Sequence, residues 1–302
     1  MKVAVTGSSG LIGTRMLATL RSDGHEVLRL VRRTPRTADE HRWDPQHRRI
    51  DTALLADVDA VVNLAGTPIR PRPFTAGYKA QLRNSRIDST ATISRALADA
   101  AAADPGRPRV LLSASGIDYY GDTGDRPIDE SAPAGTHFLA RLCVEWEAAT
   151  APAEEAGVRV VRLRTGLVVG RDAMLVRILG LVFRCGLGGR LGSGAQYWPW
   201  ISLQDEVDAI RFLLTAPVSG PVNLTAPTPV TNAEFTRVLG RVLHRPTVVP
   251  VPGFVVTVGL GEFGRSSVLG GRRALPAKLE RAGYRWTHRD LDDALRAALQ
   301  RD

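Results

Sequence analysis

Short apolar runs alternate with helical patterns over the first half of the chain. Residues 2–6 (KVAVT) and 26–31 (EVLRLV) are rich in β-branched and aliphatic residues, which predicts two strands. Between them, apolar residues recur at helical spacing over residues 11–21, and Gly24 and His25 mark a turn before the second run. These segments predict one strand–helix–strand unit at the start of the chain.

Three further strands are expected at residues 60–64, 109–113 and 159–164. The last two flank residues 138–147 (FLARLCVEWE), whose apolar positions have the period of a helix. Strands that alternate with helices are connected by crossovers, which place them parallel in one sheet. We therefore predict an α/β fold with a Rossmann-type, doubly wound parallel sheet.

The second half departs from this alternation. We expect an apolar helix from Met174, a Gly-rich and flexible stretch at 186–196, a helix over 205–216, a short strand at 222–224 and a helix capped by Thr231 that ends near His244. Two helices, residues 275–282 and 291–299, close the chain. Such a pattern predicts a smaller, mainly helical C-terminal domain.

Three aromatic residues follow the Gly-rich stretch, and two interpretations of them stay open. Tyr197, Trp198 and Trp200 lie where the two domains meet in the sequence. Aromatic rings stack on sugars and bases, but they also fill the space at a domain junction. The Gly-rich stretch before them is a candidate mobile flap over a pocket.

The first turn carries a glycine triplet, TGSSGLIG, directly between a predicted strand and a predicted helix. Gly7 permits the tight turn, Gly10 lets the backbone approach a pyrophosphate, and Gly13 allows close packing of helix and strand. The free N–H groups of the helix start face the anion. The predicted contacts of the dinucleotide at this turn are Gly7, Ser9, Gly10, Leu11, Ile12 and Gly13.

The residues after the second strand favour NADP(H) over NAD(H). An acidic residue at this point would bind the ribose 2′-hydroxyl, whereas arginine accommodates a 2′-phosphate. The sequence has Arg32 and Arg33 here. The alternative, a solvated basic strand end, stays open because arginine is frequent throughout the chain.

Small residues end the next strand, where Leu64, Ala65 and Gly66 allow a flat cofactor to lie against the backbone. Ser113 and Arg164, at the ends of two later strands, complete the predicted cofactor contacts. We assign residues 1–173 and 202–226 to an NADP-binding Rossmann domain and residues 174–201 and 227–302 to a substrate domain.

Four segments together resemble the extended short-chain dehydrogenase/reductases, the class of sugar-nucleotide epimerases and dehydratases. They are TGSSGLIG, NLAG (63–66), SASGIDYYG (113–121) and RTGLVVG (164–170). WDP (43–45), CVEWE (143–147), WPWISLQDEVDAI (198–210) and GPVNLTAPTPVTNAEF (220–235) look like the atypical branch described as epimerase-family proteins. LGGRRALPAKLERAGYRW (269–286) is similar to the characteristic C-terminal domain of that branch, whose role is unassigned.

The resemblance implies a catalytic Tyr and a Lys four residues later, assisted by a Ser at the preceding strand end. Both members of the pair are absent here, because Leu139 and Cys143 occupy their places in the helix of residues 138–147. Ser115 is the candidate for the hydrogen-bonding Ser. A non-standard proton donor is then needed, and the candidates are Tyr119, Tyr120 and His137.

His137 and Cys143 also have a purely structural interpretation. His137 is equally a helix-start residue in solvent. Cys143 has no His or Lys in its own segment that would stabilise a thiolate, so a structural role is expected for it.

Composition excludes several other classes of protein. Lys and Arg number 40 against 31 Asp and Glu, a formal charge of +9, but the arginines are scattered and no nucleic-acid partner is expected. The two cysteines, far apart in the sequence, predict neither a disulfide framework nor a metal site. No secretory leader or membrane span is expected, and a cytoplasmic setting fits best.

These observations support one leading function and one alternative from a different class. The leading hypothesis is an NADP(H)-binding enzyme of the extended short-chain type that transfers hydride to or from a small polar substrate such as a nucleotide sugar. The alternative is a non-catalytic NADP(H)-binding sensor or scaffold, because binding needs only the glycine turn and Arg32. The residues predict no oligomeric state.

Overall fold

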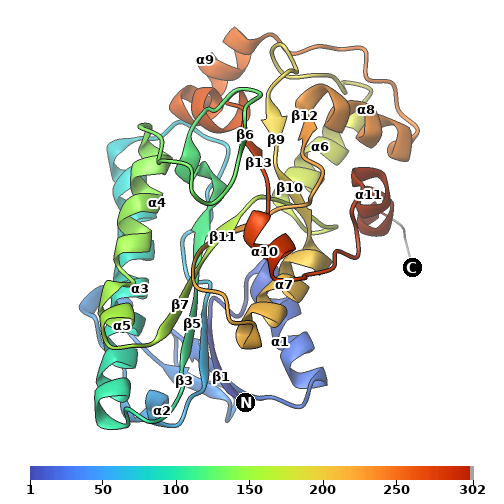
Figure 1. The fold of residues 1–302 in the computed structure, drawn as a ribbon. Helices are drawn as coiled ribbons and strands as arrows, with labels where there is room; N and C mark the ends of the chain where they lie inside the picture. The colour runs from blue at the N-terminus through green and yellow to red at the C-terminus, as the bar shows by residue number, and fades with distance from the viewer. Residues whose placement is uncertain (300–302) are drawn as a thin grey trace.

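A computed structural model describes residues 1–299, and its centre is a sheet of seven parallel strands (Figure 1). In chain order these strands are β1 (Lys2–Thr6), β2 (Glu26–Val31), β3 (Glu40–Arg42), β4 (Ala60–Asn63), β5 (Val110–Gly116), β7 (Arg159–Thr165) and β11 (Gly220–Leu224). Their order across the sheet is β11-β7-β5-β4-β1-β2-β3. The chain reverses direction across the sheet at β1, and ligands of such sheets bind at this switch point, beyond the carboxyl ends of the strands.

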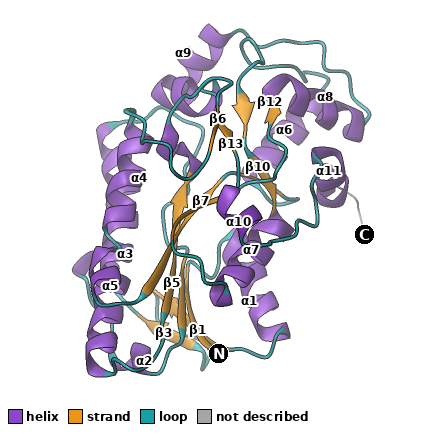
Figure 2. Cartoon of the chain, viewed as in Figure 1, coloured by secondary structure: helices purple, strands orange, loops and turns teal. Residues whose placement is uncertain are grey.

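Helices cover both faces of the sheet (Figure 2). One layer has α1 (Leu11–Ser22) and α7 (Leu203–Thr215), whose apolar side chains pack with those of β1, β4, β7 and β11. The other has α3 (Ala76–Ala103), α4 (Phe138–Ala148) and α5 (Ala151–Glu155), with the short α2 (Ala53–Ala56) below. The two layers confirm the predicted doubly wound α/β fold.

The second part of the chain builds a mainly helical unit with a hydrophobic core of its own, which includes Phe183, Trp200, Phe235 and Leu295. Its helices are α6 (Met174–Arg184), α8 (Asn232–Leu243), α9 (Gly253–Phe263) and α11 (Leu291–Leu299). The short strands are β6 (Pro127–Ile128), β8 (Leu167–Val169), β9 (Tyr197–Trp198), β10 (Trp200–Ser202), β12 (Val230–Thr231) and β13 (Arg273–Ala274). Single turns of other helix types lie at η1 (Pro45–His47), η2 (Ile117–Tyr120) and η3 (Gly264–Val268).

One C-terminal helix, α10 (Ala277–Arg281), packs on the sheet rather than in the second unit. Its Leu279, together with Tyr284, belongs to the core between α1, α7 and the sheet. Just beyond it, the buried carboxylate of Asp205 in α7 accepts hydrogen bonds from the N–H groups of Thr287 and His288, at 2.6 and 3.0 Å. The C-terminal chain therefore completes the layer that α7 starts.

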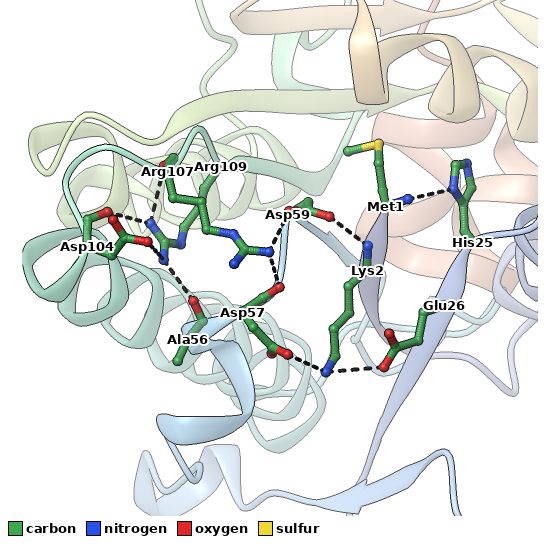
Figure 3. Close-up of polar contacts among 10 residues, drawn as sticks. All are labelled: Met1, Lys2, His25, Glu26, Ala56, Asp57, Asp59, Asp104, Arg107 and Arg109. Atoms are coloured by element: carbon green, nitrogen blue, oxygen red, sulfur yellow. Dashed lines mark hydrogen bonds and ion pairs between the residues drawn. The ribbon is translucent and has the colours of Figure 1, made fainter.

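Ion pairs close the amino edge of the sheet, opposite the carboxyl ends of the strands (Figure 3). Lys2 Nζ lies 2.7 Å from Asp57 and 3.2 Å from Glu26, and the Lys2 N–H donates to Asp59 at 2.7 Å. Arg107 reaches the other oxygen of Asp59 at 2.8 Å. This edge is thus tied together by its own side chains and leaves the opposite edge for ligands.

The structure adds elements that the apolar pattern did not predict. The long helix α3, the edge strand β3 and helix α9 were all missed. The helices and strands that were predicted occur within a few residues of their expected bounds.

Among residues 1–299, no helix has the length and apolar character needed to cross a membrane.

Candidate functional site

The glycine turn between β1 and α1 has the close packing that the triplet predicts. Gly7 adopts φ +63°, and a Cβ atom on it would lie 2.5 Å from the carbonyl oxygen of Leu64. A Cβ atom on Gly13 would lie 2.3 Å from the carbonyl oxygen of Gly7. Only glycine fits at these two positions, so the turn brings the start of α1 against the end of β4.

The start of α1 presents unpaired backbone donors. Gly10 is the N-cap residue and supplies no side-chain cap. Within residues 1–299, the N–H groups of Leu11, Ile12 and Gly13 donate to no protein oxygen. Such donors, at the positive end of the helix dipole, suit a phosphate group.

A cavity of about 740 Å³ opens beside this helix start. Ser9, Gly10 and Leu11 line one side of it, and Gln204 and His288 line another. Ser9 and Gly10 are exposed, so the predicted pyrophosphate contacts at the turn are accessible. A ligand at the helix start would lie between the two structural units.

The two arginines after β2 have different environments. Arg33 donates two hydrogen bonds to the buried carboxylate of Glu40, at 2.6 and 2.7 Å, and these bonds lower the pKa of Glu40 to about 2. Arg32 is exposed, and within the described chain its side chain has no hydrogen bond or ion pair. Arg32 is therefore the residue free to bind a phosphate, while Arg33 holds β3 against the end of β2.

A buried polar network shapes the end of β4. Thr6 Oγ1 donates to Asn63 Oδ1 at 2.7 Å and accepts from the N–H groups of Leu64 and Ala65 at 3.0 and 3.1 Å. These bonds fix the backbone at the predicted cofactor contacts Leu64, Ala65 and Gly66. All three are at least partly exposed, as a contact with a ligand requires.

Ser113 belongs to this network and not to the accessible surface. Its side chain is 1% exposed, and its hydroxyl accepts from the Asn63 amide at 3.3 Å. The buried hydroxyl of Ser113 is taken up by this network, so its predicted contact with the cofactor stays a prediction. The serine joins β5 to β4 beneath the site.

The carboxyl ends of β5 and β7 carry a second, ionic network. Ser115 and Arg164 are paired across the two strands, and both reach Glu147 of α4. Ser115 Oγ donates to Glu147 Oε1 at 2.7 Å, and Arg164 binds both carboxylate oxygens at 2.8 Å. Burial alone would lower the pKa of Arg164, but its bonds to Glu147 raise it above the ordinary value.

Arg164 also holds Tyr120, so its predicted contact with the cofactor has to be corrected. Arg164 Nη1 donates to the Tyr120 hydroxyl at 2.8 Å, and this hydroxyl donates to Asn223 Oδ1 at 2.7 Å. All three guanidinium nitrogens are thereby engaged, and only 3% of the Arg164 residue is exposed. No edge of this arginine is left for a dinucleotide.

The two tyrosines predicted as proton donors lie in unequal settings. Tyr120 is 3% exposed, and burial raises its pKa to about 12, against the opposing effect of Arg164. A phenol of this pKa is a weak acid at neutral pH. Tyr119 is partly exposed, and the Arg164 guanidinium stacks on its ring at 3.4 Å.

His137 caps the start of α4, as the structural interpretation of this residue expects, and it is only partly exposed. Its Nδ1 accepts from the N–H of Ala140 at 2.8 Å, which assigns the proton to Nε2. Burial lowers the pKa of His137, and Nε2 is buried with no partner in the described part of the chain. The side chain is a neutral hydrogen-bond donor.

The places of the missing Tyr–Lys pair are filled by packed side chains. Leu139 is 2% exposed and Cys143 is 5% exposed. Burial raises the pKa of the Cys143 thiol to about 12, so it is protonated and chemically inert at neutral pH. The structural role expected for Cys143 agrees with this environment.

Three residues of the ionic network were not among the predicted site residues. Glu147 bonds Ser115 and Arg164, Asn223 bonds Tyr120, and Glu130 accepts from the backbone N–H of Asn223 at 3.1 Å. Glu147 carried no clear signal, because most carboxylates of a helix that packs beside a sheet face the solvent, as Glu145 does. Asn223 and Glu130 are distant in the sequence and gave none.

The aromatic group and the Gly-rich stretch have structural places. Trp198 and Trp200 are 4% and 0% exposed and lie in the core of the second unit, which favours packing over ligand stacking. The Gly-rich stretch is bonded to a neighbouring segment, for example by the N–H of Gly192 to the carbonyl of Val251 at 2.8 Å. That it moves as a flap stays a prediction.

Comparison with protein families identifies the architecture. Residues 3–225 match the model of the NAD dependent epimerase/dehydratase family, and residues 251–298 match a domain of unknown function, DUF1731. The chain belongs to the NAD-dependent epimerase/dehydratase family. The C-terminal match covers α9, α10 and most of α11, so both parts of the predicted resemblance are confirmed.

Relatives of similar length span bacteria and mammals. The epimerase family protein MT2273 of Mycobacterium tuberculosis is 49% identical over 300 residues, which are 99% of this chain and 98% of the relative. Human epimerase family protein SDR39U1 is 34% identical over 98% of this chain and 99% of its own length. Their names state a family and no reaction.

Two solved structures of relatives have the same fold. Human SDR39U1 (isoform 2), crystallised with NADPH, superimposes with a TM-score of 0.85 at 31% identity, over 99% of both chains. A nucleoside-diphosphate sugar epimerase of Corynebacterium glutamicum gives a TM-score of 0.80 at 34% identity, over 99% of this chain and 58% of that protein.

Proposed function

We propose that this protein is an NADP(H)-dependent enzyme that transfers hydride to or from a small polar substrate, with nucleotide sugars as the leading class. The observation that carries the proposal is the pairing of an open helix start at Gly10 with an exposed, unpaired Arg32. The first suits a pyrophosphate and the second a 2′-phosphate. The NADPH in the crystal structure of human SDR39U1 supports the same cofactor here.

In this proposal, the bound NADPH supplies the hydride, and the protein has to place the substrate oxygen and provide a proton. Ser115 donates its only hydroxyl proton to Glu147, so it would position the substrate by accepting a hydrogen bond from a substrate hydroxyl group. Tyr120 has its hydroxyl engaged on both sides, which supports a positioning role for it. Tyr119, His137 or a water molecule remains to deliver the proton.

The test begins with calorimetric titration of the purified protein with NADPH, NADP⁺, NADH and NAD⁺. Loss of NADPH absorbance is then followed with nucleotide sugars and small carbonyl compounds. For a substrate that turns over, Ser115→Ala should lower kcat by roughly 100-fold. One of the two variants Tyr119→Phe and His137→Asn, the one that removes the proton donor, should lower kcat by a similar factor. Tyr120→Phe should keep most of the kcat. Normal turnover in Ser115→Ala would refute the assigned site.

A second candidate function is a non-catalytic NADP(H)-binding sensor, and the burial of Leu139 and Cys143 in place of the Tyr–Lys pair favours it. A sensor should bind different partners in its two cofactor states. Pull-downs with the NADP⁺-loaded and NADPH-loaded protein would then recover different proteins. The same partners in both states, together with turnover of a substrate, would reject this candidate.

For the setting, we propose a cytoplasmic protein whose partner is a small molecule and neither nucleic acid nor membrane. Both cysteines are free thiols, one buried and one exposed, as a reducing compartment allows. Many of the arginines are paired with carboxylates at the surface, as in the pair of Arg241 and Asp292, rather than gathered to face phosphates. A gel shift with DNA or RNA at low salt would contradict the proposal.

A further inference from the structure

Arg86 of α3 is a buried cation directly beside the end of β4. It is 7% exposed, and its guanidinium lies 4.9 Å from the ring of Trp146. A Cβ atom on Gly66 would lie 3.4 Å from Arg86 Cγ and 3.5 Å from Cζ, so the side chain runs along the open face of this glycine. Burial lowers the pKa of Arg86, but an arginine keeps its charge in proteins.

The charge of Arg86 is not compensated, which distinguishes it from the other buried arginines of residues 1–299. Arg164 and Arg272 each have a carboxylate oxygen at 2.8 Å, and Arg109 has one of Asp104 at 4.0 Å (Figure 3). Arg86 has no carboxylate within this distance in the same part of the chain. Buried charges are paired within the protein or bind ligands of opposite charge. Because the fold supplies no carboxylate for Arg86, a ligand is the expected partner.

The unused donors of Arg86 form one edge of its guanidinium. Nη1 donates to the carbonyl oxygens of Thr67 and Leu82, at 3.0 and 3.1 Å. Within the described chain, Nε and Nη2 donate to nothing. Neither is closed off completely, whereas Nε of Arg109 and of Arg272 is fully buried without a partner. The Nε–Nη2 edge is the one that binds two oxygens of a carboxylate or phosphate at once.

The guanidinium of Arg86 lies next to the proposed cofactor site, with Cζ and Nη1 at 3.5 and 3.6 Å from the position of a Cβ atom on Gly66. Gly66 is exposed and belongs to the predicted cofactor contacts at the end of β4. On the other side, Cys143, which fills the place of the missing Lys, is close enough for its sulfur and the guanidinium to affect each other's ionisation. Arg86 of α3 is thus a cation in the neighbourhood of the place in α4 where the Lys is missing.

We propose that Arg86 binds an oxyanion, either a carboxylate or a phosphate, at a site between Gly66 and α4. This inference rests on the proposed function, because it adds a ligand group to that cofactor site. The oxyanion has two possible sources: an acidic group of the substrate, such as that of a sugar acid or a nucleotide sugar, and a phosphate of the dinucleotide itself. Both would use the same bidentate edge.

The experiment measures two sets of affinities by calorimetry: that of NADPH for the protein alone, and those of inorganic phosphate and oxalate for the protein with and without NADPH. The variants are Arg86→Gln, which removes the charge, and Arg86→Lys, which keeps the charge but loses the paired donors. Arg83→Gln is the matched control, because Arg83 lies on the same helix, is exposed and pairs with Glu145. Thermal unfolding of each variant verifies its fold.

A substrate-side site predicts that phosphate or oxalate binds to the NADPH-loaded protein and that Arg86→Gln weakens this binding by roughly 10- to 100-fold. Arg86→Lys should fall between, and NADPH affinity should change by less than about twofold. A site for the cofactor's own phosphate predicts instead that Arg86→Gln weakens NADPH by at least roughly tenfold and that the small oxyanions compete with NADPH.

The proposal is overturned if, in folded Arg86→Gln, the affinities for NADPH, phosphate and oxalate all equal those of the wild type. It is overturned equally if phosphate and oxalate do not bind the wild type in either state and NADPH affinity is unaffected. NADPH binding by the wild type tests the proposed cofactor function, whereas the change in affinities between the wild type and Arg86→Gln tests this site. A failure of the proposed cofactor function is therefore visible separately from a failure of this site.

Discussion

The two halves of the sheet's carboxyl edge present different polar groups: backbone groups in one half and side chains in the other. Around β1 and β4, the edge presents backbone: the free N–H groups of the α1 start and the exposed chain at Gly66. Around β5 and β7, it presents side chains that already bond one another, from Ser115 through Glu147 and Arg164 to Tyr120. In the first half, which we call the open half, hydrogen-bond donors have no partner. In the second, the closed half, the polar side chains are already bonded to one another.

This contrast explains how the chain can keep a cofactor site after losing the usual catalytic pair. An anion site needs hydrogen-bond donors that have no partner in the protein. The glycine turn provides them through backbone N–H groups, which do not depend on the side chains of the catalytic pair. In the second half, the buried side chains of Leu139 and Cys143 occupy the places of the Tyr and the Lys, and a separate ionic network stabilises the strand ends. In the proposed enzyme, the proton would therefore come from residues at the margin of that network.

The largest effect is expected from breaking the closed half at its centre. Glu147→Gln leaves the Arg164 guanidinium buried without a carboxylate, and loss of one partner of such a pair lowers the free energy of unfolding by about 3–5 kcal/mol. Denaturant unfolding measures this. Glu145→Gln is the control: its carboxylate lies on the same helix, exposed and paired with Arg83, and should change stability by less than about 1 kcal/mol. Equal stabilities of the two variants would contradict the assignment.

The next effect concerns a buried acid under β7. Thr165 Oγ1 donates to Glu206 Oε1 at 2.8 Å, while Oε2 is buried with no partner within residues 1–299, and burial raises the pKa of Glu206 to about 8. Between pH 4.5 and 8 the unfolded chain therefore releases this proton and the folded chain keeps it. Stability should fall as pH rises through this window and level off above it.

Glu206→Gln removes the titration, so the variant should gain roughly 3 kcal/mol relative to the wild type between pH 5 and 8. Urea unfolding of both proteins at several pH values measures the difference. Parallel stability curves would show that Glu206 ionises normally in the folded protein.

The third test breaks the open half. Gly13→Ala forces a methyl group to within 2.3 Å of the Gly7 carbonyl oxygen, so the turn has to open. We expect a loss of about 1–3 kcal/mol in stability and no detectable NADPH binding. Gly77→Ala is the control, because nothing lies within 4 Å of its new methyl group and alanine favours a helix. Tight NADPH binding by Gly13→Ala would refute the placement of the pyrophosphate.

The smallest effect should separate the two arginines after β2. Arg32→Gln removes the unpaired guanidinium and is expected to weaken NADPH by roughly 10- to 100-fold while leaving NADH unchanged. Arg33→Gln breaks its pair with Glu40 and should affect stability more than cofactor choice. An equal loss of NADPH and NADH in Arg32→Gln would assign this residue to something other than the 2′-phosphate.

The same contrast determines what the sequence could predict. The open half depends on residues that are neighbours in the chain, so the spacing of Gly7, Gly10 and Gly13 was enough to identify it. The closed half depends on side chains that come together only after folding: Tyr120 meets Asn223 although 103 residues separate them. The bonds of Ser113 to Asn63 and of Arg164 to Tyr120 likewise join residues 50 and 44 positions apart, so the sequence could not predict these buried networks.

The missed elements have a related cause. Helix α3 buries Ser89, Thr90 and Ser94 as well as Arg86 on its inner face, so the apolar period that marks a helix is weak there. Helix α9 has the opposite character, since most of its residues are apolar and only Val256 is fully buried. An apolar period predicts a helix only when one face is apolar and the other polar.

The bond between Asp205 and the chain near Thr287 has a consequence for how the protein is made. A ribosome adds the residues in order, and 82 positions separate this carboxylate from the N–H of Thr287 that it requires. Until that last stretch leaves the exit tunnel, α7 carries an acid that has no donors from the C-terminal chain and that resists burial. Packing of the layer that α7 starts therefore depends on a segment made much later than α7, and a chain cut before Tyr284 is expected to be more susceptible to proteolysis.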